Sequence, residues 1–447
     1  MKKKSVFKEF SKYISLNILG QVAFSCYTLA DTFFVSAKLG TNGLTALNLA
    51  FPIFCVLNGI GLLIGIGAGN HYSILRNQEK KEEANKYFTN AIYLVVIFAL
   101  LFVLLGIFGS KAIVRFLGAD ETLLDLTNTY AKVMLLFAPA FLTNNLLQGF
   151  IRNDGKPSLS MAAMIVGSFS NILLDYIFIF PLNTGIFGAI LATGLAPLIS
   201  ILVLLPHLMK RKHNFRFALS KPNFRYIGNI VGSGFSPFLT EATSGIVMFL
   251  FNFIILGIAG NVGVAAFGVI TVVSLVVTAM FTGLSQGLQP LISKYHGKGE
   301  KETVSSLLEY GAIASLILAL VIYLIIFFGS SSIVSVFNSE NDLTLKGYAD
   351  EGMKIYFIAT PLLGLNIVLA TYFLAIERPF FSQIISLLRG FFVLVPCAFL
   401  LSYLFQMIGI WCTYPITEAI VLVVGILLFI LTKRREKQVA SQTKCGD

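Results

Sequence analysis

The sequence predicts an all-α polytopic membrane protein with twelve transmembrane helices, and three observations support this. First, 56% of the 447 residues are hydrophobic and the mean hydropathy is +0.82. Second, charged residues make up only 12% of the chain, whereas soluble domains carry about 25%. Third, the apolar residues gather in stretches of roughly 20, the length at which a helix crosses a bilayer.

Each predicted span is an apolar stretch bounded by charged residues, glycine or proline. The first six spans cover 13–37, 44–69, 87–108, 128–150, 158–180 and 186–208. The last six cover 229–256, 263–289, 306–328, 350–374, 380–404 and 408–431. The basic start of the chain has no short apolar core followed by a cleavage site, so we expect no cleavable signal peptide.

The basic residues predict how the spans are oriented. With an even number of spans both termini share one side, and 26 of the 33 lysines and arginines fall on that side, against 6 on the other. The positive-inside rule therefore places both termini in the cytoplasm and the chain in the cell membrane. The net charge of +11 then reflects topology and attraction to anionic lipid, and no nucleic-acid partner is expected.

The two halves of the chain repeat with an offset of about 220 residues. Two prolines 18 residues apart recur in both halves, as Pro139 with Pro157 and as Pro361 with Pro379. Gly40 and Gly260 occupy the matching loops after the first span of each half. Two repeats of six spans with the same orientation predict two six-helix bundles related by an axis along the membrane normal.

The repeat predicts the domain boundaries. We expect an amino lobe at 1–209, a cytoplasmic linker at 210–227, a carboxyl lobe at 228–432 and a basic cytoplasmic tail at 433–447. The linker is strongly basic, so it is either an amphipathic segment on the inner membrane surface or a plain loop.

Five polar residues inside predicted spans form the candidate site. Asn171 and Asp175 lie one helical turn apart in the fifth span, and Thr193 follows in the sixth. Asp31 is a second acid in the first span, with Tyr27 one turn before it. A carboxylate in hydrocarbon is costly and marks a functional site by default. We therefore expect the five side chains to converge on one cation or proton site.

The chemistry of these residues suits a small cation. Two buried carboxylates can hold a proton between them or be neutralised by Na⁺, and the Asn171 amide and Thr193 hydroxyl supply the neutral oxygens that a hard cation prefers. Tyr27 is placed to donate a hydrogen bond to Asp31. The alternative is that both aspartates only hold helices together through hydrogen bonds.

This pattern resembles the multidrug and toxic compound extrusion (MATE) transporters. The resemblance rests on the two bundles, on the ADTFFV acid in the first span, and on N-x-x-x-D in the fifth with a threonine 18 residues later. Tyr27, Asp31, Asn171, Asp175 and Thr193 are similar to the amino-lobe cation site of the DinF-like members. The resemblance implies a Na⁺- or H⁺-coupled antiporter. The chain departs from some members by having no acid within KIYFIATPLLGLNIVLATYFLAI, around the tenth span.

Three further charged residues lie deep within predicted spans. Glu241 follows Pro237 by one turn in the seventh span. It either contacts a cationic substrate or carries a second proton, or it is a hydrogen-bonded structural acid. Arg389 and Glu418 each lie about ten residues inside the eleventh and twelfth spans. Ten residues of helix bring both near the membrane midplane, so we expect a structural ion pair.

The sequence therefore predicts a transporter and no enzyme. We expect a secondary active antiporter that exports organic, mainly cationic, compounds in exchange for Na⁺ or H⁺. The alternative within the same broad fold is a flippase for lipid-linked oligosaccharide or polysaccharide; a channel or receptor fits less well. No GxxxxGK[ST] motif for ATP occurs. We expect a monomer with small-molecule and lipid partners, and no cofactor or metal beyond the coupling ion at Asp31 and Asp175.

Overall fold

The computed structural model describes residues 2–119, 121–210, 213–218, 221–337 and 342–444. Every regular element in that part of the chain is helical, which confirms the predicted all-α class. The first half contains α1 (Lys2–Asn77), α2 (Lys81–Leu104), η1 (Leu105–Gly109), α3 (Ser110–Phe116), α4 (Leu124–Leu136), α5 (Ala138–Asn153), α6 (Pro157–Ile179) and α7 (Gly185–Met209). The second half contains α8 (Phe224–Gly297), α9 (Lys301–Phe337), α10 (Leu343–Tyr356), η2 (Phe357–Ala359), α11 (Thr360–Ala375), α12 (Pro379–Leu387), η3 (Leu388–Phe392) and α13 (Leu394–Lys444).

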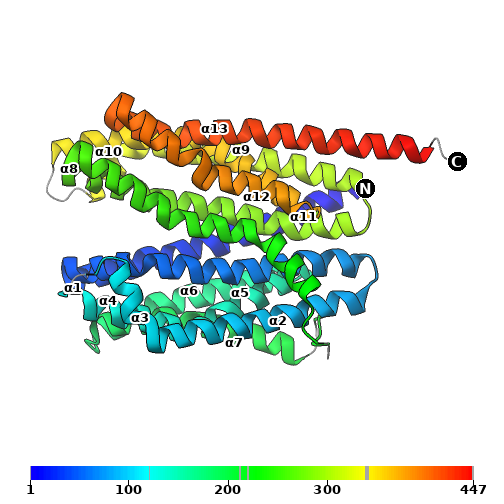
Figure 1. Cartoon of the computed structure of the whole chain (residues 1–447), viewed down its shortest axis with the longest axis horizontal. Helices are drawn as coiled ribbons and strands as arrows, with labels where there is room; N and C mark the ends of the chain where they lie inside the picture. The colour runs from blue at the N-terminus through cyan, green and yellow to red at the C-terminus, as the bar shows by residue number, and fades with distance from the viewer. Residues whose placement is uncertain (1, 120, 211–212, 219–220, 338–341, 445–447) are drawn as a thin grey trace. The chain divides into compact units, whose positions relative to one another are not determined.

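Two of the long helices are each broken at one glycine. Gly40 in α1 has φ 63° and ψ −154°, and Gly260 in α8 has φ 62° and ψ −155°. A side chain is strained in this region of backbone conformation, so glycine suits both breaks. Figure 1 shows α1 as two antiparallel arms joined at such a break. Nearly equal angles at two glycines 220 residues apart support the predicted internal repeat.

The prolines mark the same repeat. Pro157 begins α6 and Pro379 begins α12, each at the start of the helix, where its missing N–H costs nothing. The span before each is broken near its inner proline. The helices α4 and α5 meet at 47° just before Pro139, and η2 separates α10 from α11 just before Pro361.

The number of membrane crossings depends on how broken helices are treated. Nine described helices are long and apolar enough to span a membrane, or ten if α4 and α5 form one bent span. Of these, α8 has 74 residues, about 110 Å of helix at 1.5 Å per residue, against a hydrocarbon core of about 30 Å. It breaks at Gly260, and α13 breaks at Gln406 (φ 53°). The predicted count of twelve is reached when α8 and α13 are each counted as two spans and α4 with α5 as one. That count stays a prediction.

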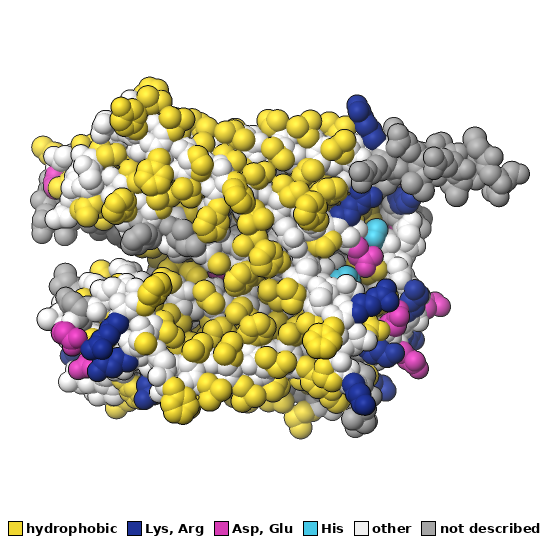
Figure 2. All heavy atoms as spheres, in the orientation of Figure 1, with side chains coloured by type: hydrophobic (Ala, Val, Ile, Leu, Met, Phe, Trp, Pro, Cys, Tyr) yellow, Lys and Arg dark blue, Asp and Glu magenta, His cyan; other side chains and the backbone are white. Residues whose placement is uncertain are grey.

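The exposed surface of the helices fits a lipid environment. Large apolar side chains such as Phe108, Phe328 and Tyr403 are strongly exposed. Figure 2 shows hydrophobic side chains over the middle of the helices and most lysines and arginines at the helix ends. A soluble monomer does not expose this much continuous apolar surface.

The chain divides into two compact units. Unit 1 comprises 1–246, 274–307 and 375–377, and unit 2 comprises 247–273, 308–374 and 378–447. The core of unit 1 is built from α1, α2, α4, α5, α6 and α7, around buried side chains such as Phe150 and Met134. The core of unit 2 includes the stacked rings of Phe267 and Trp411. The predicted lobe boundaries at 209, 227 and 432 stay predictions.

The linker is held against unit 1. Within the predicted linker 210–227, the described residues 213–218 and 221–223 contain no helix, whereas 224–227 already belong to α8. The backbone N–H groups of Arg216, Ala218 and Asn223 donate to side chains of α2, at 2.9, 2.8 and 2.9 Å. Phe215 is buried between the rings of Phe88 and Phe150.

A histidine and a glutamate join two distant segments within unit 1. His71 of α1 lies 3.3 Å through Nδ1 from Oε1 of Glu377, in the turn between α11 and α12. Its Nε2 lies 2.9 Å from the Ser233 hydroxyl, and its ring stacks on Tyr87 at 4.8 Å. The hydrogen bond from His71 lowers the pKa of the Glu377 carboxyl from its ordinary value.

Replacing Glu377 by glutamine should therefore destabilise the protein in a pH-dependent way. A lowered carboxyl pKa contributes stability above the ordinary pKa, and this is lost as pH falls through the lowered value. We expect Glu377→Gln to cost about 0.5–1 kcal/mol near neutral pH, as for a partly exposed pair, and to cost nothing only once the pH lies below the lowered carboxyl pKa. Thermal unfolding at both pH values checks this, with Glu79→Gln in an exposed turn as the control. An equal deficit at both pH values would contradict it.

Candidate functional site

The predicted site residues come from neighbouring helices of unit 1. Asp31 lies on the first arm of α1, Asn171 and Asp175 on α6, and Thr193 on α7. The helix α6 packs against both α1 and α7. All four side chains are buried, with Asp175 and Asn171 fully inaccessible. Tyr27 lies one turn before Asp31 on the same arm of α1, so the structure places all five residues on helices that contact one another.

Asn171 connects Asp175 to α7. Its amide is oriented to satisfy both neighbours, so Nδ2 donates to Asp175 Oδ2 at 3.0 Å and the amide oxygen accepts from the Thr193 backbone N–H at 3.2 Å. The Thr193 hydroxyl donates to the Ala189 carbonyl at 3.1 Å. The one-turn spacing of Asn171 and Asp175 puts them on one helix face. Only one oxygen of the Asp175 carboxylate is used by Asn171.

Asp31 has a tyrosine neighbour that the sequence analysis missed. The hydroxyl of Tyr130, on α4, donates to Asp31 Oδ2 at a long 3.5 Å. Tyr27, the predicted donor, is buried beside Asp31, and its ring packs edge-on against Phe24 at 4.9 Å. The helix α4 does carry a signal in the sequence, because Thr127 and Tyr130 lie one turn apart on one face of it, and both are buried.

The two carboxylates share one electrostatic environment. Asp175 interacts electrostatically with Asp31, and both acids act on the buried hydroxyls of Tyr27 and Tyr130. One oxygen of each carboxylate, Oδ1, is buried without a hydrogen-bond partner among the described residues. The Thr127 hydroxyl oxygen is in the same state. Buried polar atoms normally have partners, so these oxygens are free to bind an ion or a proton.

The donor set fits a hard monovalent cation or a proton better than a transition metal. The available ligands are carboxylate, amide and hydroxyl oxygens, which suit Na⁺. Among the described residues no three His, Cys, Asp or Glu side chains are grouped as a metal site. The arrangement can therefore hold a proton on either aspartate, or a cation between their free oxygens.

Glu241 lies apart from that set, on the first arm of α8 within unit 1. It is partly buried and hydrogen-bonded with Asn58 of α1. Asn58 in turn accepts from Asn145 Nδ2 of α5 at 3.2 Å. Gly59 leaves room for this contact, since a Cβ there would lie 3.3 Å from the Glu241 Cβ. Glu241 therefore sits in a polar contact between helices, and Tyr27 also feels its charge.

The charged pair predicted in the second half is brought together in unit 2. Arg389 Nε, in η3, donates to Glu418 Oε1 of α13 at 2.9 Å. Asn366 Nδ2 of α11 donates to Glu418 Oε2 at 2.7 Å and to the Glu418 carbonyl at 2.9 Å. Glu418 is fully buried, and Tyr414 is hydrogen-bonded to Arg389. The sequence analysis did not identify Asn366 or Tyr414.

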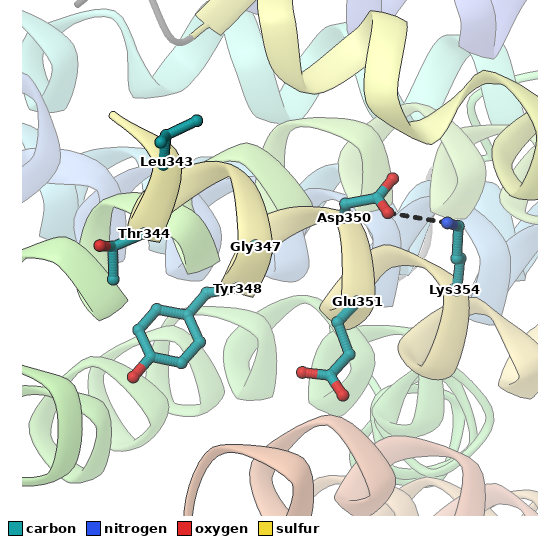
Figure 3. Close-up of a pocket in the computed structure, with 7 residues that line it drawn as sticks. All are labelled: Leu343, Thr344, Gly347, Tyr348, Asp350, Glu351 and Lys354. Atoms are coloured by element: carbon teal, nitrogen blue, oxygen red, sulfur yellow. Dashed lines mark hydrogen bonds and ion pairs between the residues drawn. The ribbon is translucent and has the colours of Figure 1, made fainter. Parts of the chain in front are cut away.

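A cavity of about 620 Å³ lies along α10 in unit 2. Figure 3 shows its lining, in which Tyr348 and Glu351 lie on one side of the helix and Asp350 pairs with Lys354 at 2.7 Å. The remaining lining residues are Leu343, Thr344 and Gly347. It is open to the surface and contains none of the predicted site residues.

Comparison with known proteins gives one family. The MatE family model matches residues 17–177 and 238–400. The multidrug export protein MepA of Staphylococcus saprophyticus is 26% identical over 435 residues, covering 97% of this chain and 95% of that protein. MepA of Staphylococcus aureus strain MSSA476 is 25% identical with the same coverage.

Solved structures show the same fold. A multidrug resistance MATE family transporter of the MOP superfamily, in an outward-facing conformation, matches with a TM-score of 0.90 at 22% identity, covering 96% of both chains. A MOP superfamily transporter from Pyrococcus furiosus matches with a TM-score of 0.87 at 23% identity, covering 95% of both chains. At these identities the likeness supports the architecture of the helices and nothing finer.

Proposed function

This chain belongs to the MatE family, and from that premise we propose that it exports organic compounds, mainly cationic, in exchange for Na⁺ or H⁺. The observation that carries this proposal is the pair of buried carboxylates, Asp31 and Asp175, each with one oxygen that lacks a partner among the described residues. The multidrug export relatives support a drug-like cargo. The protein is a multi-pass membrane protein; a monomeric state and cytoplasmic termini are part of the proposal.

Cation binding at this site acts as the driving step. A cation or proton that enters from outside neutralises the carboxylates and changes how the helices α1, α6 and α7 pack. The exchange requires that this ion and the exported compound favour different conformations, which is a coupling free energy between two sites. Alternating access then carries the compound outward and the ion inward. The set Tyr27, Asp31, Asn171, Asp175 and Thr193 acts as a DinF-like amino-lobe site.

Glu241 has a separate role in this proposal. It lies on α8, and its carboxylate is hydrogen-bonded with the Asn58 amide and forms no ion pair with a cationic side chain of the described residues. An acid without a cationic partner attracts a positively charged group. We propose that Glu241 binds the positive charge of the exported compound or carries a second proton, while Asp31 and Asp175 bind the coupling ion.

A transport assay tests the function directly. The protein is reconstituted in liposomes, and uptake of a fluorescent organic cation is followed with a Na⁺ gradient or a pH gradient imposed separately. We expect one of the two gradients to drive accumulation. Movement of a lipid-linked oligosaccharide in the same vesicles, without transport of the cation, would instead identify a flippase.

Tyr130 offers a milder test of the site. Its hydroxyl donates to Asp31 across a long 3.5 Å contact, so Tyr130→Phe removes one donor and keeps the ring. We expect the affinity for the coupling ion to change by about tenfold or less, because one hydrogen bond to a charged group contributes about 1.5 kcal/mol. Ion-dependent transport rates measure the change, with Tyr93→Phe on α2 as the control. No change in ion dependence would remove Tyr130 from the site.

A further inference from the structure

Three consecutive residues at the end of α5 contact other segments of unit 1. Arg152 Nη1 donates to Gln286 Oε1 of α8 and, at 3.5 Å, to Asn17 Oδ1 of α1. Asn153 Nδ2 donates to Gln289 Oε1 at 3.4 Å, and Asp154 pairs with Arg76. All three side chains are buried. This end of unit 1 is closed by polar contacts between first-half helices and the second arm of α8.

Arg152 differs in its hydrogen-bond partners from Arg76, another arginine at this end of unit 1. Arg76, nearby, has the carboxylate of Asp154 as its partner. The partners of Arg152 in the described part of the chain are two neutral amide oxygens, although the residue is only 4% exposed. A buried charge without an opposite charge is expensive, because hydrogen bonds to amides replace only part of its hydration.

Packing alone does not require a charge at this position. By the offset of 222 residues that relates the paired prolines, Arg152 corresponds to Leu374, near the end of α11. Leu374 is equally buried, so an apolar side chain suits the matching place in the second repeat. The arginine therefore adds an electrostatic cost that its counterpart avoids.

Helices of the two halves also approach closely beside this contact. A Cβ at Gly287 of α8 would lie 2.9 Å from the Tyr13 carbonyl oxygen of α1. Further along α8, Ser293 donates to Asn70 Oδ1 of α1 at 2.5 Å. Opening this end exposes Arg152 to water and separates these contacts together.

We propose that Arg152 is a positioning residue for the transport cycle. Its charge is buried without an acidic partner among the described residues, and this keeps closure of the cytoplasmic end reversible. The hydrogen bonds to Asn17 and Gln286 stabilise the closed state, whereas hydration of the Arg152 guanidinium stabilises the open state. This inference rests on the proposed alternating access, since only then must this end open. The charge shifts the populations of the two states.

Substitutions at the two ends of one hydrogen bond should then act in opposite directions. Arg152→Met removes the costly charge and should favour the closed state. Gln286→Leu removes a partner, leaves the charge and should favour the open state. Gln286→Glu supplies a carboxylate to Arg152 and should lock the closed state. Arg152→Lys keeps the charge and serves as the matched control.

The readout is the reactivity of a thiol introduced by Ser293→Cys, a buried and nearly isosteric position. The five native cysteines are replaced by alanine, and labelling of the purified protein by a polar maleimide is followed over time. We expect Gln286→Leu to label severalfold faster than the parent, Arg152→Lys to resemble it, and Arg152→Met and Gln286→Glu to label severalfold more slowly. Thermal unfolding of Arg152→Met should occur at or above the parent temperature.

The opposite result has a clear meaning. If Arg152→Met labels faster than the parent, or fails to fold, Arg152 simply holds the helices together and the proposal is wrong. Faster labelling of Gln286→Glu would also overturn it. Labelling needs no substrate and no gradient. A chain that fails the transport assay but shows the expected order of labelling would therefore count against the proposed function alone.

Discussion

Replacing Asp31 or Asp175 by asparagine is expected to abolish gradient-driven transport while leaving the protein folded and inserted in the membrane. Asparagine has nearly the same shape and keeps one oxygen, so the packing of α1 and α6 is preserved. It removes the negative charge that a cation needs and cannot take up a proton at neutral pH. The buried carboxylates are costly in the membrane, so their loss should not destabilise the fold.

The measurement is uptake of a fluorescent organic cation in liposomes under the gradient that drives the wild type. Asp125→Asn is the matched control, because Asp125 is an exposed acid on α4 in the same unit. We expect the control to transport at the wild-type rate and both site variants to show only the leak without gradient. Full gradient-driven transport by both site variants would remove the central assignment.

Replacing Arg389 by alanine is expected to destabilise the protein by about 3–5 kcal/mol, the cost of breaking a buried ion pair by removing one partner. The variant leaves Glu418 buried without its cationic partner, and the Asn366 amide still donates to the carboxylate. Adding Glu418→Ala should recover part of the loss, because the uncompensated charge is then gone. Recovery stays partial, since Asn366 keeps the carbonyl of residue 418 but loses the carboxylate acceptor, and a cavity remains.

Thermal unfolding of the wild type, both single variants and the double variant measures the coupling between the two side chains. Arg115 and Glu121 form a comparable pair at 3.0 Å, but both side chains are strongly exposed. Arg115→Ala should therefore cost about 1 kcal/mol or less and serves as the control. Strictly additive effects of Arg389→Ala and Glu418→Ala would show that this ion pair contributes nothing to stability.

Part of the candidate site followed from local spacing. Asn171 and Asp175 are four residues apart, which places them on one face of any helix, and the structure joins them by a hydrogen bond. The internal repeat could also be predicted from the sequence, because Gly40 and Gly260 both occupy a backbone conformation in which other residues are strained. The similar depth of Arg389 and Glu418 in their spans was enough to predict their contact.

The rest depended on which helices become neighbours. Tyr130 reaches Asp31 only because α4 packs against α1, and no spacing along the chain contains that fact. Asn366 contacts Glu418 for a similar reason, since the two residues lie 52 positions apart in sequence on different helices. Unit 1 also includes 274–307, although the repeat predicts that segment in the other lobe.

Cation binding by the purified protein, without substrate, tests the central assignment most directly. Isothermal titration with Na⁺, and proton release measured in parallel, are carried out on the wild type, Asp175→Asn and Glu241→Gln. We expect Glu241→Gln to bind the coupling ion as the wild type does, and Asp175→Asn to show no binding. If Glu241→Gln loses ion binding as completely as Asp175→Asn, the division of roles between the two acids is wrong.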